Sequence, residues 1–186
     1  MHPYEFLQRY GPTALVLEVT AEPGEAFAAE LAKNGFDLVL PCSDARSLAP
    51  LKARLEDHEG IKVELLEGNL DDRHFAENLY PHCEPHDIGL IVCGIEAGHP
   101  RQAGSLISSL TRVFMPRLRA RQHSGVLVVD LTGKAQRLGE TLAHELRPED
   151  IDVLTVCVDQ GLGDTAPRAF ARQALDHMDQ GPILTL

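Results

Sequence analysis

The first stretch with residues suited to chemistry is the turn Glu18-Val-Thr-Ala-Glu-Pro-Gly24. It follows an apolar run and precedes a helical pattern, which is the arrangement that opens a dinucleotide-binding β-α unit. A turn that holds a phosphate carries several glycines, so that its backbone can approach the ligand at the helix N-terminus. This turn has Gly24 alone, together with one proline and two carboxylates. Glu22 and Glu25 lie near the helix start, where a carboxylate itself interacts favourably with the helix dipole.

A second candidate site is the segment His82-Cys83-Glu-Pro-His86. Imidazole nitrogen and thiolate sulfur are zinc ligands, and His74 or His99 could supply a fourth. The segment lacks a second pair of ligands at a diagnostic spacing, and the nine histidines of the chain make chance neighbours common. We therefore expect a solvated loop here and no metal site.

Two further kinds of site have no positive support. The stretch Asp159-Gln-Gly-Leu-Gly-Asp164 alternates carboxylates and glycines, but it lacks the spacing of a calcium loop. We interpret it as a plain loop. Serine or cysteine with the local signature of a hydrolase nucleophile is also missing.

Strand and helix patterns alternate from one end of the chain to the other. Apolar runs typical of strands lie at residues 13–19, 37–41, 61–66, 88–93, 126–131, 153–158 and 183–186. Helical patterns lie at residues 4–10, 23–34, 48–58, 71–80, 103–121, 135–146 and 167–178. We expect Ser43 or Ser47 to cap the helix at 48–58.

This alternation indicates right-handed crossovers and a mostly parallel sheet that is covered on both faces. We predict an α/β, Rossmann-like, doubly wound sheet of about seven strands. At 186 residues with 44% apolar residues, the chain has material for one core, and we expect residues 1–186 to form a single three-layer domain.

Charge and hydropathy exclude several classes of partner. The net charge of −11 argues against nucleic acid or an anionic membrane surface as a partner, because such binding depends on basic residues. The basic cluster between Arg112 and Arg121 is interpreted as a solvated helix face. No apolar run approaches the roughly 18 residues that a spanning helix needs, and the N-terminus has no signal-peptide pattern. We expect a cytoplasmic protein.

The four cysteines do not predict disulfides. Cys42, Cys93 and Cys157 lie in or at the end of apolar runs, where free cysteine behaves as a small hydrophobe. Cys83 alone has polar neighbours in the sequence, so a disulfide framework is not expected.

Several segments have more specific amino-acid sequences. They read Tyr10-Gly-Pro-Thr-Ala-Leu-Val, Gly24-Glu-Ala-Phe-Ala-Ala-Glu-Leu-Ala, Gly35-Phe-Asp-Leu-Val-Leu, Leu110-Thr-Arg-Val-Phe-Met-Pro-Arg-Leu, and Gly133-Lys-Ala-Gln followed by Leu142-Ala-His-Glu-Leu-Arg-Pro. In order and spacing they resemble the short-chain dehydrogenase/reductase family over nearly the whole chain. The family is usually longer, so this chain looks like a shortened and degenerate member.

The resemblance implies a dinucleotide site that this chain has altered. The family's glycine motif falls on Leu17, Glu18, Glu22 and Gly24, so Gly24 is its one vestige. Like charges about 5 Å apart at an effective dielectric near 20 repel by roughly 3 kcal/mol, which opposes a pyrophosphate beside Glu18 and Glu22. We therefore expect no cofactor; the alternative is NAD or NADP.

Other cofactor positions differ as well. The residue after the second strand that would face an adenosine 2'-phosphate falls near Asp44, whose charge opposes NADP but suits a ribose hydroxyl. The adenine-flanking pair becomes Asn69-Leu70, and the two rims of the cleft become Cys93-Gly-Ile-Glu96 and Val158-Asp159.

The family's catalytic set is incomplete in this chain. The family uses a tyrosine four residues before a lysine, with a serine and an asparagine that orient substrate and water. Lys134 corresponds to the lysine and Thr132 lies about where the serine would be, but Asp130 stands at the tyrosine's spacing. All tyrosines precede this region, at Tyr4, Tyr10 and Tyr80. Lys134 and Thr132 are therefore vestigial candidates, and we expect no catalytic residue of the family's kind.

The resemblance also implies association surfaces. In the family, helices equivalent to residues 103–121 and 135–146 form a four-helix contact between subunits, and the last helix and strand form a second contact. Apolar residues recur here at helical spacing, namely Leu106, Leu110, Val113, Phe114, Leu118, Leu138, Leu142 and Leu146. About half of them are expected to cover the sheet instead.

Three hypotheses follow for the function. The first is a non-catalytic pseudoenzyme that forms a homo- or hetero-oligomer, possibly as the structural subunit of an active, full-length family member. The alternative is an NAD(P)-dependent oxidoreductase with a rearranged site, in which Lys134, Thr132 and Asp130 would act without a phenol. The third is a small-molecule binder that uses the emptied cleft.

Overall fold

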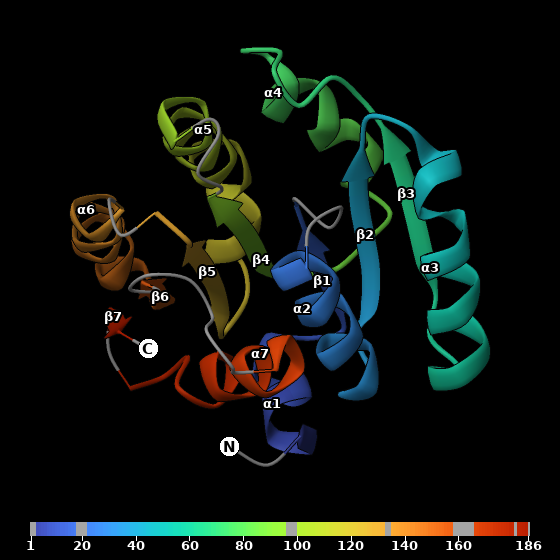
Figure 1. Cartoon of the computed structure of the whole chain (residues 1–186). Helices are drawn as coiled ribbons and strands as arrows, with labels where there is room; N and C mark the ends of the chain where they lie inside the picture. The colour runs from blue at the N-terminus through green and yellow to red at the C-terminus, as the bar shows by residue number, and fades with distance from the viewer. Residues whose placement is uncertain are drawn as a thin grey trace.

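A parallel sheet of seven strands runs through the described part of the chain (Figure 1). The computed structural model describes residues 3–17, 22–95, 100–132, 135–157, 166–180 and 182–185. The strands are β1 (Thr13–Val16), β2 (Asp37–Cys42), β3 (Val63–Glu67), β4 (Ile88–Ile95), β5 (Ser124–Asp130), β6 (Ile151–Cys157) and β7 (Ile183–Thr185). Their order is β3-β2-β1-β4-β5-β6-β7, and each neighbouring pair is parallel. The predicted Rossmann-like, doubly wound fold is confirmed.

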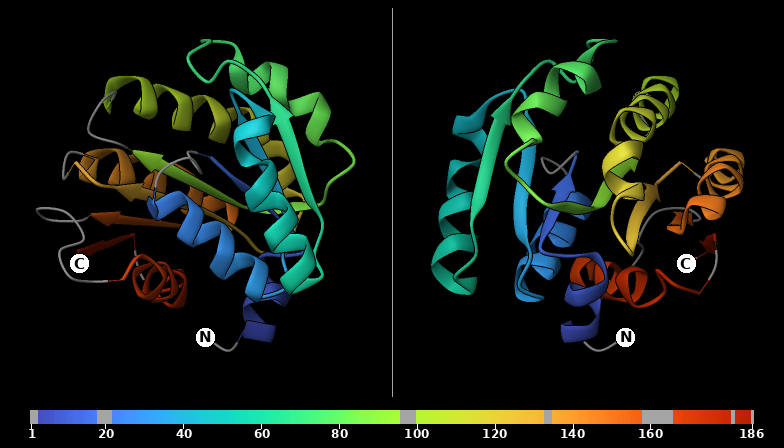
Figure 2. Two further views of the ribbon diagram at one scale, coloured as in Figure 1. Left: turned by 45° about the vertical axis from the view of Figure 1, so that its right-hand side comes forward. Right: turned by 180° about the vertical axis from the view of Figure 1, so that it is seen from behind.

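Helices cover both faces of the sheet (Figure 2). They are α1 (Pro3–Tyr10), α2 (Glu22–Lys33), α3 (Ala45–Glu59), α4 (Phe75–Leu79), α5 (Pro100–Arg119), α6 (Gln136–Leu146) and α7 (Pro167–Asp176), with 3-10 turns η1 (Tyr80–Cys83) and η2 (Arg147–Glu149). Helices α1, α2, α3 and α7 bury their apolar side chains on one face. Helices α4, α5 and α6 do so on the other. In the described part, no helix is both long and apolar enough to cross a bilayer.

The burial of the central strands explains the continuous apolar runs in the sequence. All seven residues of β5 are buried, and its side chains alternate between the two apolar clusters. Leu127 and Val129 face the α2 and α7 side, whereas Val126 and Val128 face the α5 and α6 side. A strand buried on both faces becomes a continuous apolar run in the sequence.

Local interactions explain where helix α3 begins and ends. The Asp44 carboxylate accepts a hydrogen bond from the Arg46 N–H at 2.9 Å, which caps the helix. The expected caps Ser43 and Ser47 are wrong, because Ser47 lies inside the first turn and its hydroxyl donates back to the Asp44 carbonyl. The helix ends at Gly60, which adopts the left-handed conformation at φ 68°.

Helix α4 is shorter than the helix predicted at residues 71–80. The Asn69 side chain accepts a hydrogen bond from the Asp71 N–H, and Asp72 accepts one from the His74 N–H, both at 3.0 Å. Such side-chain turns compete with helical hydrogen bonds for the same backbone groups. The chain therefore forms two turns before α4 begins at Phe75.

Most of the apolar residues on α5 and α6 pack inside the chain. Leu110, Phe114 and Leu118 are buried against the sheet, and so are Leu142 and Leu146. A smaller set is only partly buried, and it consists of Leu106, Val113, Met115 and Leu138. This division agrees with the expectation that about half of the pattern covers the sheet.

Helix α6 lies so close to β6 that one position admits no side chain. A Cβ added to Gly139 would lie 2.1 Å from the Thr155 hydroxyl oxygen and 2.7 Å from the Thr155 Cβ. Thr155 is fully buried, so it cannot move toward solvent. By contrast, a Cβ at Gly104 on α5 would meet only Leu138, at an ordinary 3.8 Å.

These two helical glycines give a matched prediction for stability. Gly139→Ala should destabilise the protein by about 1 to 3 kcal/mol, because α6 must shift away from β6. Gly104→Ala should instead be neutral or stabilise by up to about 1 kcal/mol, because alanine favours helix. Urea unfolding of both variants measures the difference, and equal effects of the two substitutions would contradict the close approach.

Candidate functional site

The carboxyl ends of the strands meet at one edge of the sheet, which we call the carboxyl edge. It is formed by Leu17, Cys42, Glu67, Ile95, Asp130 and Cys157 at or just after the strand ends. The strand order reverses between β1 and β4, which form the centre of the sheet. In open α/β sheets, ligands bind outside the carboxyl ends of the strands at such a reversal. The carboxyl edge is therefore the candidate site.

Several residues singled out in the sequence lie outside the described residues. The residues concerned are Glu18, Glu96, His99, Lys134, Val158, Asp159 and Asp164, and the side chain of Glu22. Gly24 is described, and it lies half-buried in the first turn of α2.

Asp130 organises the turn that leads from β5 to α6. Its side chain is fully buried, and Oδ1 accepts hydrogen bonds from the Thr132 N–H at 2.8 Å and from the Thr132 hydroxyl at 2.6 Å. Oδ2 accepts a third hydrogen bond, from the Ala135 N–H at the start of α6, at 2.6 Å. Asp130 is thus a structural carboxylate that fixes Thr132 and the chain on both sides of Lys134.

Thr132 is half-buried at the carboxyl edge. Its hydroxyl donates to Asp130, which fixes the orientation of the side chain.

Two more carboxylates lie at the carboxyl ends of β2 and β3. Glu67 is the last residue of β3, and its Oε1 accepts a hydrogen bond from the Ala45 N–H at 2.9 Å. Asp44 accepts the next N–H, that of Arg46. Two consecutive N–H groups at the start of α3 are therefore occupied by the chain's own carboxylates.

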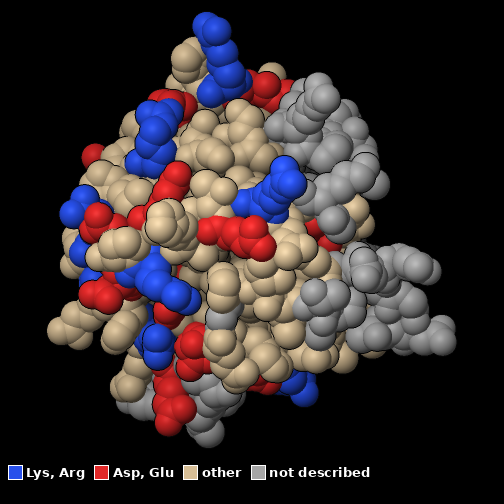
Figure 3. All heavy atoms as spheres, turned by 90° about the vertical axis from the view of Figure 1, so that its left-hand side faces the viewer, with Lys and Arg blue, Asp and Glu red and all other residues tan. Residues whose placement is uncertain are grey.

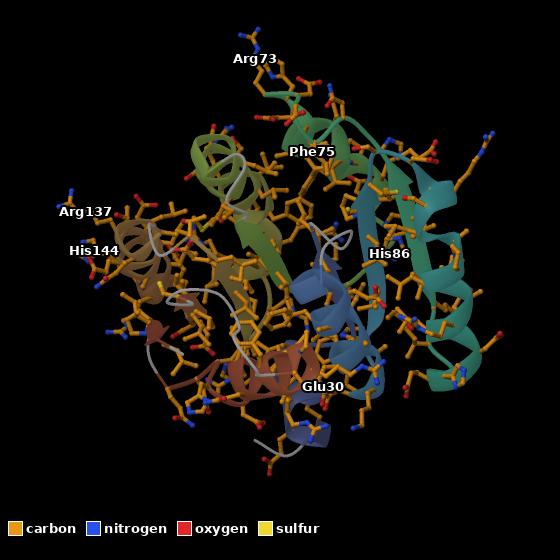
Figure 4. All side chains as sticks on the ribbon, in the orientation of Figure 1. Glu30, Arg73, Phe75, His86, Arg137 and His144 are labelled. Atoms are coloured by element: carbon orange, nitrogen blue, oxygen red, sulfur yellow. The ribbon has the colours of Figure 1, made fainter. Side chains whose placement is uncertain are left out.

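A hollow of about 260 Å³ lies beside Glu67, between the end of β3 and α4. Phe75 forms part of its apolar wall, and Figure 4 labels this residue on α4, whereas Arg73 extends away from the molecule. The polar residues around the hollow are Glu67, Asn69, Asp72, Asn78 and His82. Sequence analysis identified Asn69 but not the hollow, because the hollow depends on how α4 packs.

The tyrosines lie away from the β5 end of the carboxyl edge. Tyr10 is buried near the amino ends of the strands, where its hydroxyl donates to Asp152 at 2.6 Å. Burial, then the hydrogen bond to this carboxylate, raises the pKa of Tyr10 above its ordinary value. Tyr80 packs edge-on against Phe114, with ring centroids 5.3 Å apart. Tyr4 belongs to α1, and its side chain lies outside the described residues.

The residues of the metal-like segment do not converge. Cys83 is fully buried among the apolar side chains beneath α5, which corrects its expected polar surroundings. Burial raises the pKa of the Cys83 thiol to about 12. His82 is exposed, whereas His86 Nε2 lies 2.8 Å from Glu64 Oε2. No group of three possible ligands forms among the described residues.

The basic residues at the end of α5 hold parts of the chain together. Arg117 donates to the carbonyls of Cys83, Glu84 and His86, with distances of 2.6, 3.0 and 2.7 Å. Arg121 donates to Asp87 and to the Gly11 carbonyl. We interpreted this cluster as a solvated face, but two of its arginines tie α5 to the loops beneath it. Backbone carbonyl partners leave no signal in a sequence.

Comparison with known proteins begins with the sequence. No family model matches the chain. A 7beta-hydroxysteroid dehydrogenase from Clostridium sardiniense is 31% identical over 86 residues, which make up 46% of this chain. The match spans only 33% of that relative's length.

Solved structures match nearly the whole chain. A metagenomic short-chain oxidoreductase in complex with NADP has a TM-score of 0.78 at 18% identity, covering 95% of this chain and 97% of its own. A short-chain dehydrogenase from Sphingobium yanoikuyae in complex with NADPH has a TM-score of 0.75 at 19% identity, with coverages of 94% and 87%. A 7beta-hydroxysteroid dehydrogenase structure has a TM-score of 0.79 at 16% identity, with coverages of 97% and 88%. At these identities, the likeness establishes the fold.

The comparisons contradict the expectation of no cofactor. Two of these proteins hold NADP or NADPH, and their folds match nearly the full length of this chain. The expectation depended on the carboxylates Glu18 and Glu22, and the described residues place neither side chain. Charge in one turn is therefore not a sufficient reason to exclude a dinucleotide from this sheet edge.

The turn after β5 gives a prediction for Asp130→Asn. In wild type the carboxylate accepts hydrogen bonds from Thr132 and from the Ala135 N–H. In either orientation of the asparagine amide, its NH₂ group faces a backbone N–H that also donates. At least one charge-assisted hydrogen bond is therefore lost. Unfolding in urea should show a loss of about 2 kcal/mol or more. The control Asp57→Asn, at an exposed site on α3, should stay within about 0.5 kcal/mol of wild type. Equal stability of the two variants would refute the role of Asp130.

Proposed function

We propose that this chain, a shortened relative of the short-chain dehydrogenases/reductases, binds a nicotinamide dinucleotide at its carboxyl edge and acts as an oxidoreductase with a rearranged catalytic site. The observation that carries the proposal is the end-to-end likeness of the fold to dehydrogenases that hold this cofactor. The order of strands places the reversal between β1 and β4, where such folds take a dinucleotide.

Two residues near the carboxyl edge suit such a ligand. Gly24 at the start of α2 has no side chain to obstruct a ligand, and Asp44 carries an acceptor suited to a ribose hydroxyl. A bound nicotinamide supplies hydride transfer, and the protein supplies binding and orientation.

Thr132 and Lys134 are the chain's candidates for handling the substrate. Asp130 accepts from the Thr132 hydroxyl and so fixes the orientation of this side chain at the carboxyl edge. Lys134 follows two residues later in the sequence, and its ammonium would favour the negative charge that develops on an alcohol oxygen. This arrangement replaces the missing phenol by a threonine, a lysine and their supporting carboxylate.

Dinucleotide binding is the first test. We expect a thermal melt with millimolar NADH or NADPH to shift upward, because a ligand at one hundred times its Kd stabilises a protein by about 2.7 kcal/mol. ADP-ribose, which lacks the nicotinamide, should also shift the melt and so separate binding from chemistry. The absence of a shift with each of these ligands would contradict the proposal.

Chemistry is tested with the class of substrate that the relatives' names suggest. A panel of 7beta-hydroxysteroids and bulky ketones is assayed by NAD(P)H absorbance, on wild type, Thr132→Val and Thr132→Ser. We expect Thr132→Val to lose at least about tenfold in kcat/KM and Thr132→Ser to retain most activity, because only valine removes the hydroxyl. Equal rates for all three would remove Thr132 from the mechanism.

A second candidate function is association, as a homo-oligomer or with a full-length, active relative. The observation that favours it is the row of partly buried apolar residues on α5 and α6. Figure 3 shows the side of the molecule on which these helices lie, where acidic, basic and uncharged residues are interspersed. The family resemblance implies a second contact through α7 and β7. A surface of mixed charge around apolar residues is compatible with a subunit contact.

Size-exclusion chromatography with light scattering tests the association. We expect a mass above 20.4 kDa for the chain alone or with an added dehydrogenase. Leu106→Gln combined with Val113→Gln should lower the apparent mass, because it makes the proposed contact polar. Leu65→Gln, a similar change of a partly buried residue on β3, should leave it unchanged. A monomeric mass for the chain both alone and with the added dehydrogenase would contradict the association.

A further inference from the structure

A second hollow lies at the opposite edge of the sheet, where β5 begins at Ser124 and β6 begins at Ile151, and we call this edge the amino edge. The hollow measures about 210 Å³. Its walls come from α1, from the end of α6 and the turn η2, from β6, and from the chain between α7 and β7. The titratable residues that line it are Arg9, His123, Arg147, Asp150, Asp152 and Asp179. Charges of both signs therefore surround one hollow.

Some of these charged groups are already paired within the chain, and others are not. The Asp152 carboxylate accepts hydrogen bonds from Arg9 Nη2 at 2.9 Å and from the Tyr10 hydroxyl at 2.6 Å. The side chains of Arg147, Asp150 and Asp179 are exposed, and within the described part of the chain they form no hydrogen bond or ion pair. One guanidinium and two carboxylates are therefore available to a ligand.

Strand β6 also presents backbone groups to the hollow. Thr155 pairs with Ile183 of β7, and its N–H donates to the Pro182 carbonyl at 2.8 Å. Because backbone groups alternate in direction along a strand, the N–H and C=O of Val153 face the β7 side as well. Pro182 stands where the next donor to the Val153 carbonyl would be, and proline has no N–H.

Val153 therefore keeps one donor and one acceptor for a partner outside the sheet. The residue lines the hollow and is only 7% exposed. Among the described residues, none forms a backbone hydrogen bond with Val153 from the β7 side. A buried N–H or C=O without a partner costs free energy, so a ligand that supplies both partners gains from these two groups.

We infer that this hollow binds a free α-amino acid in its zwitterionic form. The carboxylate of the ligand accepts from the Val153 N–H and pairs with Arg147. Its ammonium donates to the Val153 carbonyl and pairs with Asp150 and Asp179. Hydrogen bonds to charged groups are stronger than those between neutral groups, so the zwitterion suits this lining better than a neutral amide does. The inference is independent of the proposed function, because the amino edge and the carboxyl edge are opposite ends of the strands.

The size of the hollow and its lining argue against other occupants. Sites for drug-sized ligands measure roughly 300 to 1,000 Å³, so a hollow of about 210 Å³ suits a smaller molecule. A peptide that adds to a sheet edge pairs over several residues, whereas β7 already occupies β6 from Thr155 onward. A metal ion is not favoured either, since the described residues contain no group of three possible metal ligands.

Calorimetric titration with the standard L-amino acids, one at a time, tests the class of ligand. Wild type should bind at least one of them with a Kd below about 1 mM. The N-acetyl derivative and the α-amide of that amino acid should each bind at least about tenfold more weakly, because each lacks one of the two charges.

Arg147→Gln tests the contact with the ligand's carboxylate. It should weaken binding of the tightest amino acid by at least about tenfold. Arg137→Gln is the matched control, because Arg137 is an exposed arginine of α6 that lies outside the hollow (Figure 4). It should change the affinity by less than about twofold.

The double variant Asp150→Asn with Asp179→Asn tests the contact with the ammonium. Asn accepts the positive φ of Asp150, so the turn before β6 is kept. Binding should weaken by at least about tenfold. The control Asp57→Asn with Glu59→Gln removes two exposed carboxylates of α3 and should leave the affinity within about twofold of wild type.

Amide NMR of the isotope-labelled protein tests the place of the ligand. The Val153 N–H signal should shift on addition of the tightest amino acid. Failure of every amino acid to bind, or a derivative that binds as tightly as its parent, would overturn the zwitterion site. Wild-type affinity in both sets of hollow variants, or signal shifts confined to the carboxyl edge, would overturn its place at the amino edge.

Discussion

A parallel sheet must be covered on both faces, and this constraint arranges everything else in the molecule. Because neighbouring strands are parallel, each connection between them has to cross one face of the sheet and return to the same starting edge. All loops that follow the strands therefore leave from one edge. Gly24, Asp44, Asn69 and Thr132 lie far apart in the sequence, but they follow β1, β2, β3 and β5 and come out at this same edge.

Carboxylates at this edge are held by backbone N–H groups of the chain itself. Asp44 and Glu67 accept from the first turn of α3, and Asp130 accepts from the start of α6. Such contacts stabilise helix N-termini and use the donors that phosphates would otherwise occupy. The hollow beside β3 lies next to Glu67 and has apolar walls.

Much of the fold could be predicted from the sequence, because strands buried on both faces leave continuous apolar runs. Strand β1 was predicted to start at Thr13 and β4 at Ile88, and both do. The cap of α3 was missed since Asp, Ser and Ser lie within five residues and only the backbone geometry selects Asp44. Helix α4 was overestimated because the turns made by Asn69 and Asp72 depend on side-chain hydrogen bonds.

The site was harder to predict than the fold. The single glycine of the turn and its carboxylates were visible in the sequence, but the prediction drawn from them and from the altered cleft rims, that no cofactor binds, was wrong. The buried place of Cys83 and the contact of Glu67 with Ala45 depend on tertiary packing, and neither has a sequence pattern. Thr132 was identified by its resemblance, whereas the role of Asp130 as its support required the structure.

A crystal structure of the protein grown with NADH would test the central claim most directly. The account predicts density for the dinucleotide along the carboxyl edge. It also predicts the nicotinamide ring on the side of Thr132. Density for NADH at any other face of the molecule, or an unliganded carboxyl edge at saturating NADH, would contradict the account.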